Sequence, residues 1–317
     1  MYNKVVVPLD GSELAEGVLP HVVEMIRDRG SQVYLLSVAP LMKGIAPALV
    51  DVPPPSVGMQ DRQRIERELV EYLGTVAQRL KPVADDVQVG VRFGRPADDI
   101  LAFAGEVGAD LIAMSTHGRS GLSQWVFGNV ADRVLRGATC PVLLVRAGLR
   151  RETTLKSDLD ITYRRILVPL DGSELAEQVL PYVKALIRPN HTHVFLISVL
   201  TTGLGDRTVT LLTSYPPGLQ LATTARHHAK VQMRSYLRSV AATVREQGAA
   251  VHIAVQRGSP ADEILAYAAE VEADLIGMTT YGLSGVSRWV YGNVARKVLQ
   301  GAHSPMLLVR PTGAKRL

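Results

Sequence analysis

The chain has 317 residues, of which 47% are hydrophobic and 21% charged, and its formal net charge is +5. This composition is that of an ordinary soluble globular protein of about two domains. The single cysteine, Cys140, excludes an intrachain disulfide framework, and no apolar run approaches the ~20 residues that a membrane-spanning helix needs. The opening residues also lack the apolar core of a signal peptide, so we expect a cytoplasmic protein.

The positive charge is concentrated in the second half of the chain. Residues 1–146 hold 15 Lys and Arg against 17 Asp and Glu, whereas residues 165–317 hold 16 against 10. A basic domain attracts anionic partners. However, the arginines are scattered along the sequence and no basic run is interleaved with aromatic residues, so the sequence does not predict a nucleic-acid partner.

Short apolar runs alternate with helical patterns from the N-terminus onward. Runs rich in Val, Ile and Leu predict five strands in the first half, at residues 5–9, 33–38, 87–93, 110–115 and 141–146. Helical patterns lie between them, at residues 12–27, at 61–80, from Pro96 onward and up to Arg136. Continuous apolar runs are typical of parallel strands covered on both faces. The first half therefore predicts an open, doubly wound α/β domain with a five-stranded parallel sheet flanked by helices.

The second half of the chain repeats the first. Residues 5–20 and 166–181 are identical at 13 of 16 positions, and residues 118–146 and 282–310 at 19 of 29. Strands are predicted again at residues 165–170, 194–199, 251–256, 274–279 and 305–310. A repeat of this length is a duplicated domain rather than a solenoid unit, whose period is about 20 to 50 residues. We expect one domain at 1–147, a polar linker at 148–164 and a second domain at 165–312.

A ligand is expected at the carboxyl ends of the strands, near the strand where the order of an open sheet reverses. The first strand is expected to lie between the second and the fourth. Asp10 follows that strand, and Asp171 follows its counterpart in the second half. Such a carboxylate suits a ribose hydroxyl or a metal, and equally the capping of the next helix. For Ser12, capping is the expected role.

The segment after the fourth strand is rich in glycine and leads into a helix. Gly118 is followed after nine residues by Gly128 and Asn129, and the second half repeats this spacing. Glycines let an anion approach backbone amides, and the unpaired amides at a helix start suit phosphate. The alternative is structural, with Gly128 in a tight turn and Asn129 as the helix N-cap. The GxxxxGK[ST] loop of common NTPases is absent.

Residues around this loop differ between the halves. His117 is replaced by Tyr281 and Arg119 by Leu283, so neither can be essential to a function that both halves share. Arg119 nevertheless predicts tighter polyphosphate binding in the first half. No catalytic constellation is repeated, and Cys140 is interpreted as a small buried residue rather than a nucleophile.

The opening VPLDGS, the glycine loop and the closing CPVLLVR resemble the universal stress protein family, and both halves carry the resemblance. It implies a tandem protein whose domains each have strand order 3-2-1-4-5 and pair along their last strand. The family's nucleotide-binding members have a loop written G-x2-G-x9-G-[ST]. This chain keeps its second and third glycines and departs elsewhere: Ser115 and Thr279 replace the first glycine, and Asn129 and Asn293 replace the final Ser/Thr. An Asn side chain still donates hydrogen bonds, so phosphate contact is retained in principle.

By resemblance, an adenine nucleotide would lie at this edge of each domain, as ATP with Mg²⁺ held through the phosphates. The residues expected around it in the first domain are Pro8, Leu9, Asp10, Val38, Ser115, His117, Gly118, Arg119, Gly128, Asn129 and Val130. Those expected in the second domain are Pro169, Leu170, Asp171, Val199, Thr279, Gly282, Gly292, Asn293 and Val294.

Three hypotheses about function follow. The first is an ATP-binding stress-response regulator or nucleotide sensor. The second is a nucleotide-free interaction module, in which the loops only cap helices and the segments PVLLVR and PMLLVR form a dimerisation surface. The third is a slow ATPase or a nucleotidyl-transfer enzyme, for which the sequence offers no general base beyond Asp10. We expect a homo-oligomer, a dimer of two-domain chains, and no membrane partner.

Overall fold

The chain folds into two units, Met1–Thr162 and Tyr163–Leu317. The computed structural model describes residues 1–40, 59–116, 128–146, 159, 161–201, 216–281 and 292–312. The units divide inside the segment 148–164, and each is treated by itself below.

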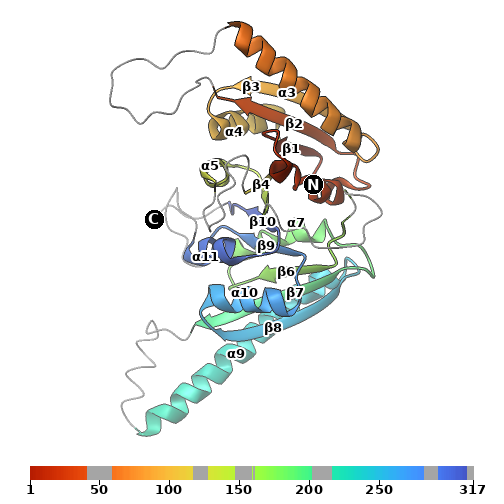
Figure 1. Ribbon diagram of the computed structural model, residues 1–317. Coiled ribbons are helices and arrows are strands. Elements are labelled where there is room, and N and C mark those ends of the chain that lie inside the picture. The colour runs from red at the N-terminus through yellow and green to blue at the C-terminus, as the bar shows by residue number, and fades with distance from the viewer. Residues whose placement is uncertain are drawn as a thin grey trace, which may run out of the picture. The chain divides into compact units, whose positions relative to one another are not determined.

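Unit 1 is built around a parallel sheet of five strands (Figure 1). These are β1 (Lys4–Pro8), β2 (Gln32–Ala39), β3 (Asp86–Phe93), β4 (Leu111–Ser115) and β5 (Val142–Val145). Their order is β3-β2-β1-β4-β5 and every neighbouring pair is parallel, which confirms the predicted fold class and order. Its helices are α1 (Glu13–Glu16), α2 (Leu19–Ile26), α3 (Met59–Leu80), α4 (Pro96–Val107) and α5 (Asn129–Gly137).

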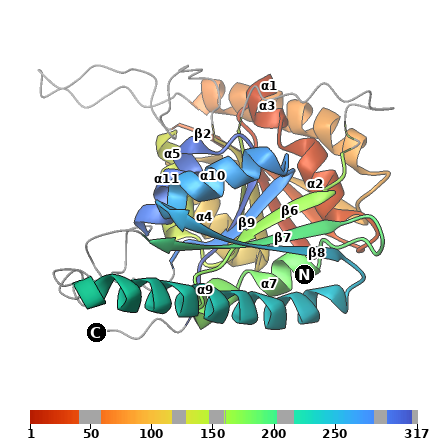
Figure 2. The ribbon, with the colours of Figure 1, turned by 90° about the horizontal axis from the view of Figure 1, so that it is seen from below.

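Unit 2 repeats this architecture (Figure 2). Its strands are β6 (Arg165–Pro169), β7 (His193–Thr201), β8 (Ala250–Gly258), β9 (Leu275–Thr279) and β10 (Met306–Val309), in the order β8-β7-β6-β9-β10. All neighbours are again parallel. Its described helices are α6 (Glu174–Glu177), α7 (Leu180–Lys184), α9 (Pro216–Arg245), α10 (Pro260–Glu270) and α11 (Asn293–Gly301).

Both faces of the central strands are covered. Consecutive side chains of a strand point to opposite faces, and Val5, Val6 and Val7 of β1 are all fully buried. The same holds for Ile166 and Leu167 of β6. This explains why these strands have continuous apolar runs instead of an alternating pattern.

The single helix predicted at residues 12–27 is wrong, because the segment forms two short helices. Proline has no N–H, so Pro20 cannot donate to the carbonyl of Glu16, and the helix breaks before it. Pro20 instead stands in the first turn of α2, where proline is tolerated. Pro181 does the same at the start of α7, although Gln178 there replaces Gly17. The proline, rather than the glycine, therefore explains the break.

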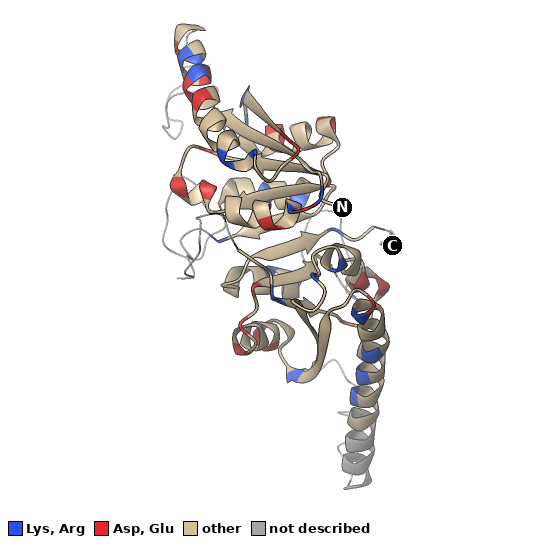
Figure 3. Cartoon of the chain, turned by 90° about the vertical axis from the view of Figure 1, so that its right-hand side faces the viewer, with Lys and Arg blue, Asp and Glu red and all other residues tan. Residues whose placement is uncertain are grey.

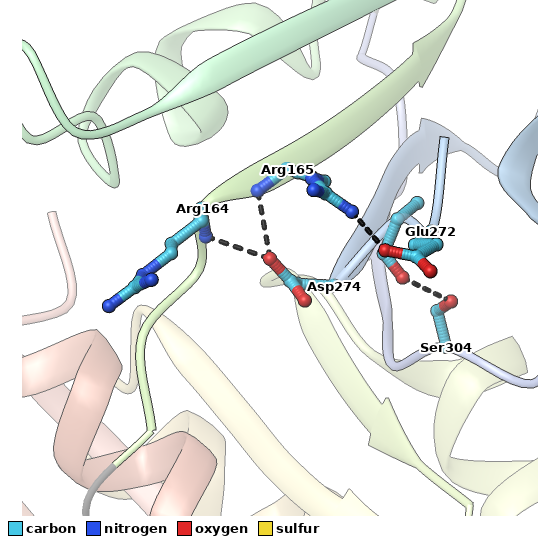
Figure 4. A network of polar contacts seen from close by, with 6 residues as sticks. Arg164, Arg165, Glu272, Asp274 and Ser304 are labelled. Atoms are coloured by element: carbon cyan, nitrogen blue, oxygen red, sulfur yellow. Dashed lines mark hydrogen bonds and ion pairs between the residues drawn. The ribbon is translucent and has the colours of Figure 1, made fainter. Parts of the chain in front are cut away.

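The amino ends of the central strands of unit 2 are joined by a polar network (Figure 4). The carboxylate of Asp274, just before β9, accepts hydrogen bonds from the backbone amides of Arg164 and Arg165, both at 2.9 Å. The Arg165 guanidinium also pairs with Glu272, and Ser304 Oγ donates to the Ala273 carbonyl at 2.6 Å. In unit 1, Asp110 accepts from the first amides of its sheet in the same way. The network aligns the strands at the edge opposite the predicted ligand edge.

We predict that Asp274→Ala lowers the free energy of unfolding by about 1–2 kcal/mol, because two backbone amides at the start of β6 lose a charged acceptor. The exposed pair between Arg165 and Glu272 provides a control, and Glu272→Ala should cost less than about 1 kcal/mol. Urea denaturation of the full chain measures both. A smaller loss of stability for Asp274→Ala than for Glu272→Ala would contradict the role of Asp274 in aligning the strands.

Candidate functional site

The strand order places the predicted ligand residues at one edge of each sheet. In unit 1, β1 lies between β2 and β4, so the chain leaves it at the point where the strand order reverses. The turn after β1 is fixed to β2 by two hydrogen bonds. The Leu9 amide donates to the Leu36 carbonyl at 2.9 Å, and Ser37 Oγ donates to the Leu9 carbonyl at 2.7 Å. Pro8, Leu9, Val38 and Ser115 thus belong to strand ends of the same edge, as predicted.

Asp10 forms a tight turn with Ser12. Asp10 Oδ1 accepts hydrogen bonds from the Ser12 amide at 3.0 Å and from Ser12 Oγ at 2.6 Å. Ser12 Oγ in turn accepts from the Ala15 amide at 3.1 Å, which confirms Ser12 as the N-cap of α1. Gly11 between them has a φ of +83°, a conformation that favours glycine. One carboxylate oxygen of Asp10 therefore positions this turn, and a ligand contact by Asp10 stays a prediction.

The start of α5 is held against the end of β4. The Gly128 amide donates to the Thr116 carbonyl at 3.2 Å, and Gly128 is the N-cap of the helix. The prediction of Asn129 as N-cap is therefore wrong, because Asn129 is already the first helical residue. The amides of Asn129, Val130 and Ala131 have no acceptor within the helix, since each lies in its first turn. These amides, and not that of Gly128, are the groups that an anion could use.

Glycine is needed at position 128 because the backbone passes so close to Thr116. A Cβ atom there would lie 2.9 Å from the Thr116 carbonyl oxygen. Unit 2 has the same arrangement with slightly more space. The Gly292 amide donates to the Thr280 carbonyl at 2.9 Å, and a Cβ at Gly292 would lie 3.4 Å from that oxygen.

The side chains that replace the first glycine of the family loop are almost completely buried. Ser115 is 8% exposed and Thr279 is 6% exposed. The Thr279 hydroxyl donates to the Tyr281 carbonyl at 2.6 Å, whereas the Ser115 hydroxyl has no hydrogen-bond partner among the residues that the structure describes. The two units therefore differ in the hydrogen bonding of this side chain, although in both it is buried at the end of the fourth strand.

A cluster behind the Asp10 turn was missed by the sequence analysis. The Tyr72 hydroxyl of α3 donates to Glu16 Oε1 at 3.1 Å, and Arg79 pairs with Glu16 Oε2 at 2.6 Å. Burial raises the pKa of Tyr72, and the charges of Glu16 and Asp10 raise it further. The cluster ties α3 to the helix that follows the turn. The repeat was the available signal, because Tyr72 and Glu16 recur as Tyr236 and Glu177.

The same cluster is altered in unit 2. Thr243 stands where unit 1 has Arg79, so Glu177 lacks that arginine, and Lys184 donates to Thr243 Oγ1 at 3.0 Å instead. Burial and then the charge of Glu177 raise the pKa of Tyr236. The turn at Asp171 is nonetheless built as in unit 1, with Ser173 donating to Asp171 Oδ1 from its amide at 3.0 Å and from its hydroxyl at 2.6 Å.

The remaining predicted residues of unit 2 occupy the corresponding positions. Pro169 ends β6, and Leu170 and Asp171 follow it. Val199 and Thr279 belong to β7 and β9, and Gly292 caps α11, which begins with Asn293 and Val294. Four predicted site residues lie outside the described residues: His117, Gly118, Arg119 and Gly282.

Neither a catalytic nor a metal site is evident in the described part of the chain. No group of three or more His, Cys, Asp and Glu side chains there could hold a metal ion. Cys140 is half-buried rather than buried as predicted. Burial raises the pKa of its thiol to about 11, so the thiol is protonated at neutral pH. None of the helices that the structure describes combines the length and the hydrophobicity that spanning a lipid bilayer requires.

Comparison with known proteins agrees with this geometry. The family model for the universal stress protein family matches residues 1–146 and 162–310. The chain belongs to this family. Universal stress protein MJ0531 of Methanocaldococcus jannaschii is 33% identical over 153 residues, which are 46% of this chain and 83% of that protein. Universal stress protein YxiE of Bacillus subtilis is 28% identical over 149 residues, again 46% of this chain but 100% of that protein.

A solved structure shows the same fold over nearly the whole length. A universal stress protein from Archaeoglobus fulgidus superposes with a TM-score of 0.64 at 21% identity, covering 98% of this chain and 97% of that one. The tandem universal stress protein fold predicted from the sequence is therefore confirmed.

The space around the two N-cap glycines differs, so replacing each of them by alanine should have unequal effects on stability. We expect Gly292→Ala to cost about 0.5–1 kcal/mol of stability, which is the usual cost of alanine at an N-cap. Gly128→Ala should cost about 1 kcal/mol more, because its Cβ would press on the Thr116 carbonyl. Thermal unfolding of the two single variants measures the difference, and equal losses would show that the close approach to Thr116 is unimportant.

Proposed function

We propose that each unit binds an adenine nucleotide, with ATP as the preferred ligand, and that the protein acts as a nucleotide-dependent regulator of a stress response. The observation that carries this proposal is the position of the helix starts. In each unit a glycine amide bonds to the residue after the fourth strand and so holds three unpaired helix amides at the ligand edge. The positive end of the helix dipole favours phosphate at the same place.

Each part of the nucleotide has candidate partners among the residues at this edge. The phosphates would accept hydrogen bonds from the amides of Asn129 and Val130 and from the Asn129 side chain. Asp10 would accept from a ribose hydroxyl, and Val38 would lie against the adenine. Mg²⁺ would be held through the phosphates and offset their charge. In unit 2 these roles fall to Asn293, Val294, Asp171 and Val199.

The departures from the family loop are compatible with this ligand. Ser115 and Thr279 are more than nine-tenths buried, so their side chains occupy the strand end. The change from Ser or Thr to Asn at 129 and 293 keeps a side-chain donor at the first position of the helix. Both observations support nucleotide binding in the two units.

A nucleotide-free interaction module is the second candidate. Two polar groups at the proposed site favour it, because Asp10 Oδ1 and the Gly128 amide already form hydrogen bonds within unit 1. In this function β5 and β10, which stand at the end of the strand order of their own units, would provide pairing edges. ATP titration separates the two candidates.

Replacing both asparagines by aspartate tests the phosphate contact. Asn129→Asp together with Asn293→Asp puts a carboxylate where phosphate is expected, so we predict at least a tenfold loss of ATP affinity. The fold should be retained, because an acidic residue in the first turn of a helix is favourable. Isothermal calorimetry with ATP and Mg²⁺ measures the affinity, and thermal unfolding checks the fold.

Asn190→Asp is the matched control, since it makes the same change in the turn before β7, at the opposite edge of the sheet. Its ATP affinity should equal that of the unchanged protein. Unaltered ATP binding by the double variant would refute the proposed phosphate site. If the unchanged protein binds neither ATP, ADP nor AMP, the interaction module becomes the better account.

A further inference from the structure

Helix α9 has a charge composition unlike that of its counterpart in unit 1. Over Pro216–Arg245 it contains five Lys and Arg and no Asp or Glu, whereas α3 contains four of each. Figure 3 shows this contrast, with basic residues alone along α9 and both signs along α3. The excess of basic residues in the second half is thus partly gathered on one helix.

The described basic residues of α9 form a ridge. Lys230, Arg234 and Arg238 follow one another at four-residue spacing, which places them on one side of the helix. All three are exposed. The apolar side of α9, with Leu237, Val240, Ala241 and Val244, is buried where the helix packs on β7 and β8. We call Lys230, Arg234 and Arg238 the α9 ridge.

Within the described part of the chain, no acidic side chain neutralises the α9 ridge. Among the described residues, its three side chains take part in no ion pair or hydrogen bond. In α3, by contrast, Arg64 pairs with Asp61 and Arg79 pairs with Glu16. The helix therefore offers uncompensated charge, which attracts an anionic partner.

The length of α9 makes the ridge accessible. A helix of 30 residues spans about 45 Å, whereas the nine-residue strands β7 and β8 span about 30 Å. Figures 1 and 2 show α9 running past the ends of these strands. Lys230 is exposed although it lies seven residues, or about two turns, before the buried Leu237 and so on the same side of the helix.

From this arrangement we infer that the α9 ridge binds the phosphate backbone of duplex nucleic acid without sequence preference. From Lys230 to Arg238 the ridge spans about 12 Å, and duplex DNA presents about seven phosphate charges over that length. A membrane surface fits less well, because a helix that binds lipid needs a free apolar face and that of α9 is covered by the sheet from Leu237 to Val244. Val231 is the one large apolar side chain of α9 that is exposed in the described residues.

The basic residues are scattered in the sequence, which for that reason did not predict a nucleic-acid partner. Basic residues that are four positions apart do not form a run in the sequence, yet an α-helix brings the three charges close together on its surface. The ridge uses no residue of the proposed nucleotide site, although Met233 of the same helix lies near the turn at Asp171, where a Cβ at Gly172 would be 3.6 Å from Met233 Cε.

Fluorescence anisotropy with a labelled duplex of about 20 base pairs of mixed sequence tests this inference on the full chain. We expect binding at low salt that weakens as salt rises. Lys230→Gln, Arg234→Gln and Arg238→Gln together should lower the affinity at least tenfold and reduce the slope of log K against log salt by about three. Glutamine is a good helix former, so circular dichroism should show α9 intact.

Arg62→Gln, Arg64→Gln and Arg67→Gln together remove the same charge from α3 and serve as the control, with an expected change below about twofold. The inference is overturned if the unchanged chain does not bind the duplex at low salt, or if both triple variants lose affinity equally. It is also overturned if the chain binds phosphatidylglycerol vesicles but not the duplex, because the ridge would then recognise a lipid surface.

Discussion

The hydrogen bond between a glycine amide and the carbonyl after the fourth strand is the interaction on which the proposed function depends. Through it, Gly128 and Gly292 bring the start of a helix to the edge where the strand order reverses. Without this contact the first helix amides, which have no acceptor within their helix, would not be held at the end of the fourth strand. The contact requires a residue without a side chain in unit 1, because the backbone passes so close to Thr116. The close approach thus accounts for glycine at position 128, whereas Gly292 makes the same hydrogen bond with more space around it.

Much of the fold follows from the local sequence. Each feature that the sequence did not predict has a physical explanation. Continuous Val, Ile and Leu runs predicted the parallel strands correctly, since both faces of β1 and β6 are covered. The break before Pro20 was missed, because proline is accepted in a first turn but removes the hydrogen bond that would join two helices. The N-cap was misplaced by one residue, because the contact between Gly128 and Thr116 is tertiary. Tyr72 and Glu16 lie 56 positions apart, so no local pattern could pair them.

The two units keep one architecture and differ in their charged side chains. Both retain the Asp-Gly-Ser turn with closely similar hydrogen bonds. Around it, Thr243 replaces Arg79. Helix α3 has charged residues of both signs, whereas all the Lys, Arg, Asp and Glu residues of α9 are basic. Duplication explains this pattern, since buried strands and turn residues preserve the fold, whereas exposed helix positions change at little cost in stability. In our proposals, the second unit can therefore bind a second partner while both units bind nucleotide.

The amide resonances of the helix starts test the central claim most directly. Two-dimensional ¹H–¹⁵N spectra of the full chain are recorded with Mg²⁺ and either ATP or adenosine. Our account predicts that ATP shifts the amide signals of Asn129, Val130, Asn293 and Val294, whereas adenosine, which lacks phosphates, leaves them nearly unchanged. If these four signals stay in place at saturating ATP, or if adenosine moves them equally, the helix starts do not hold phosphate.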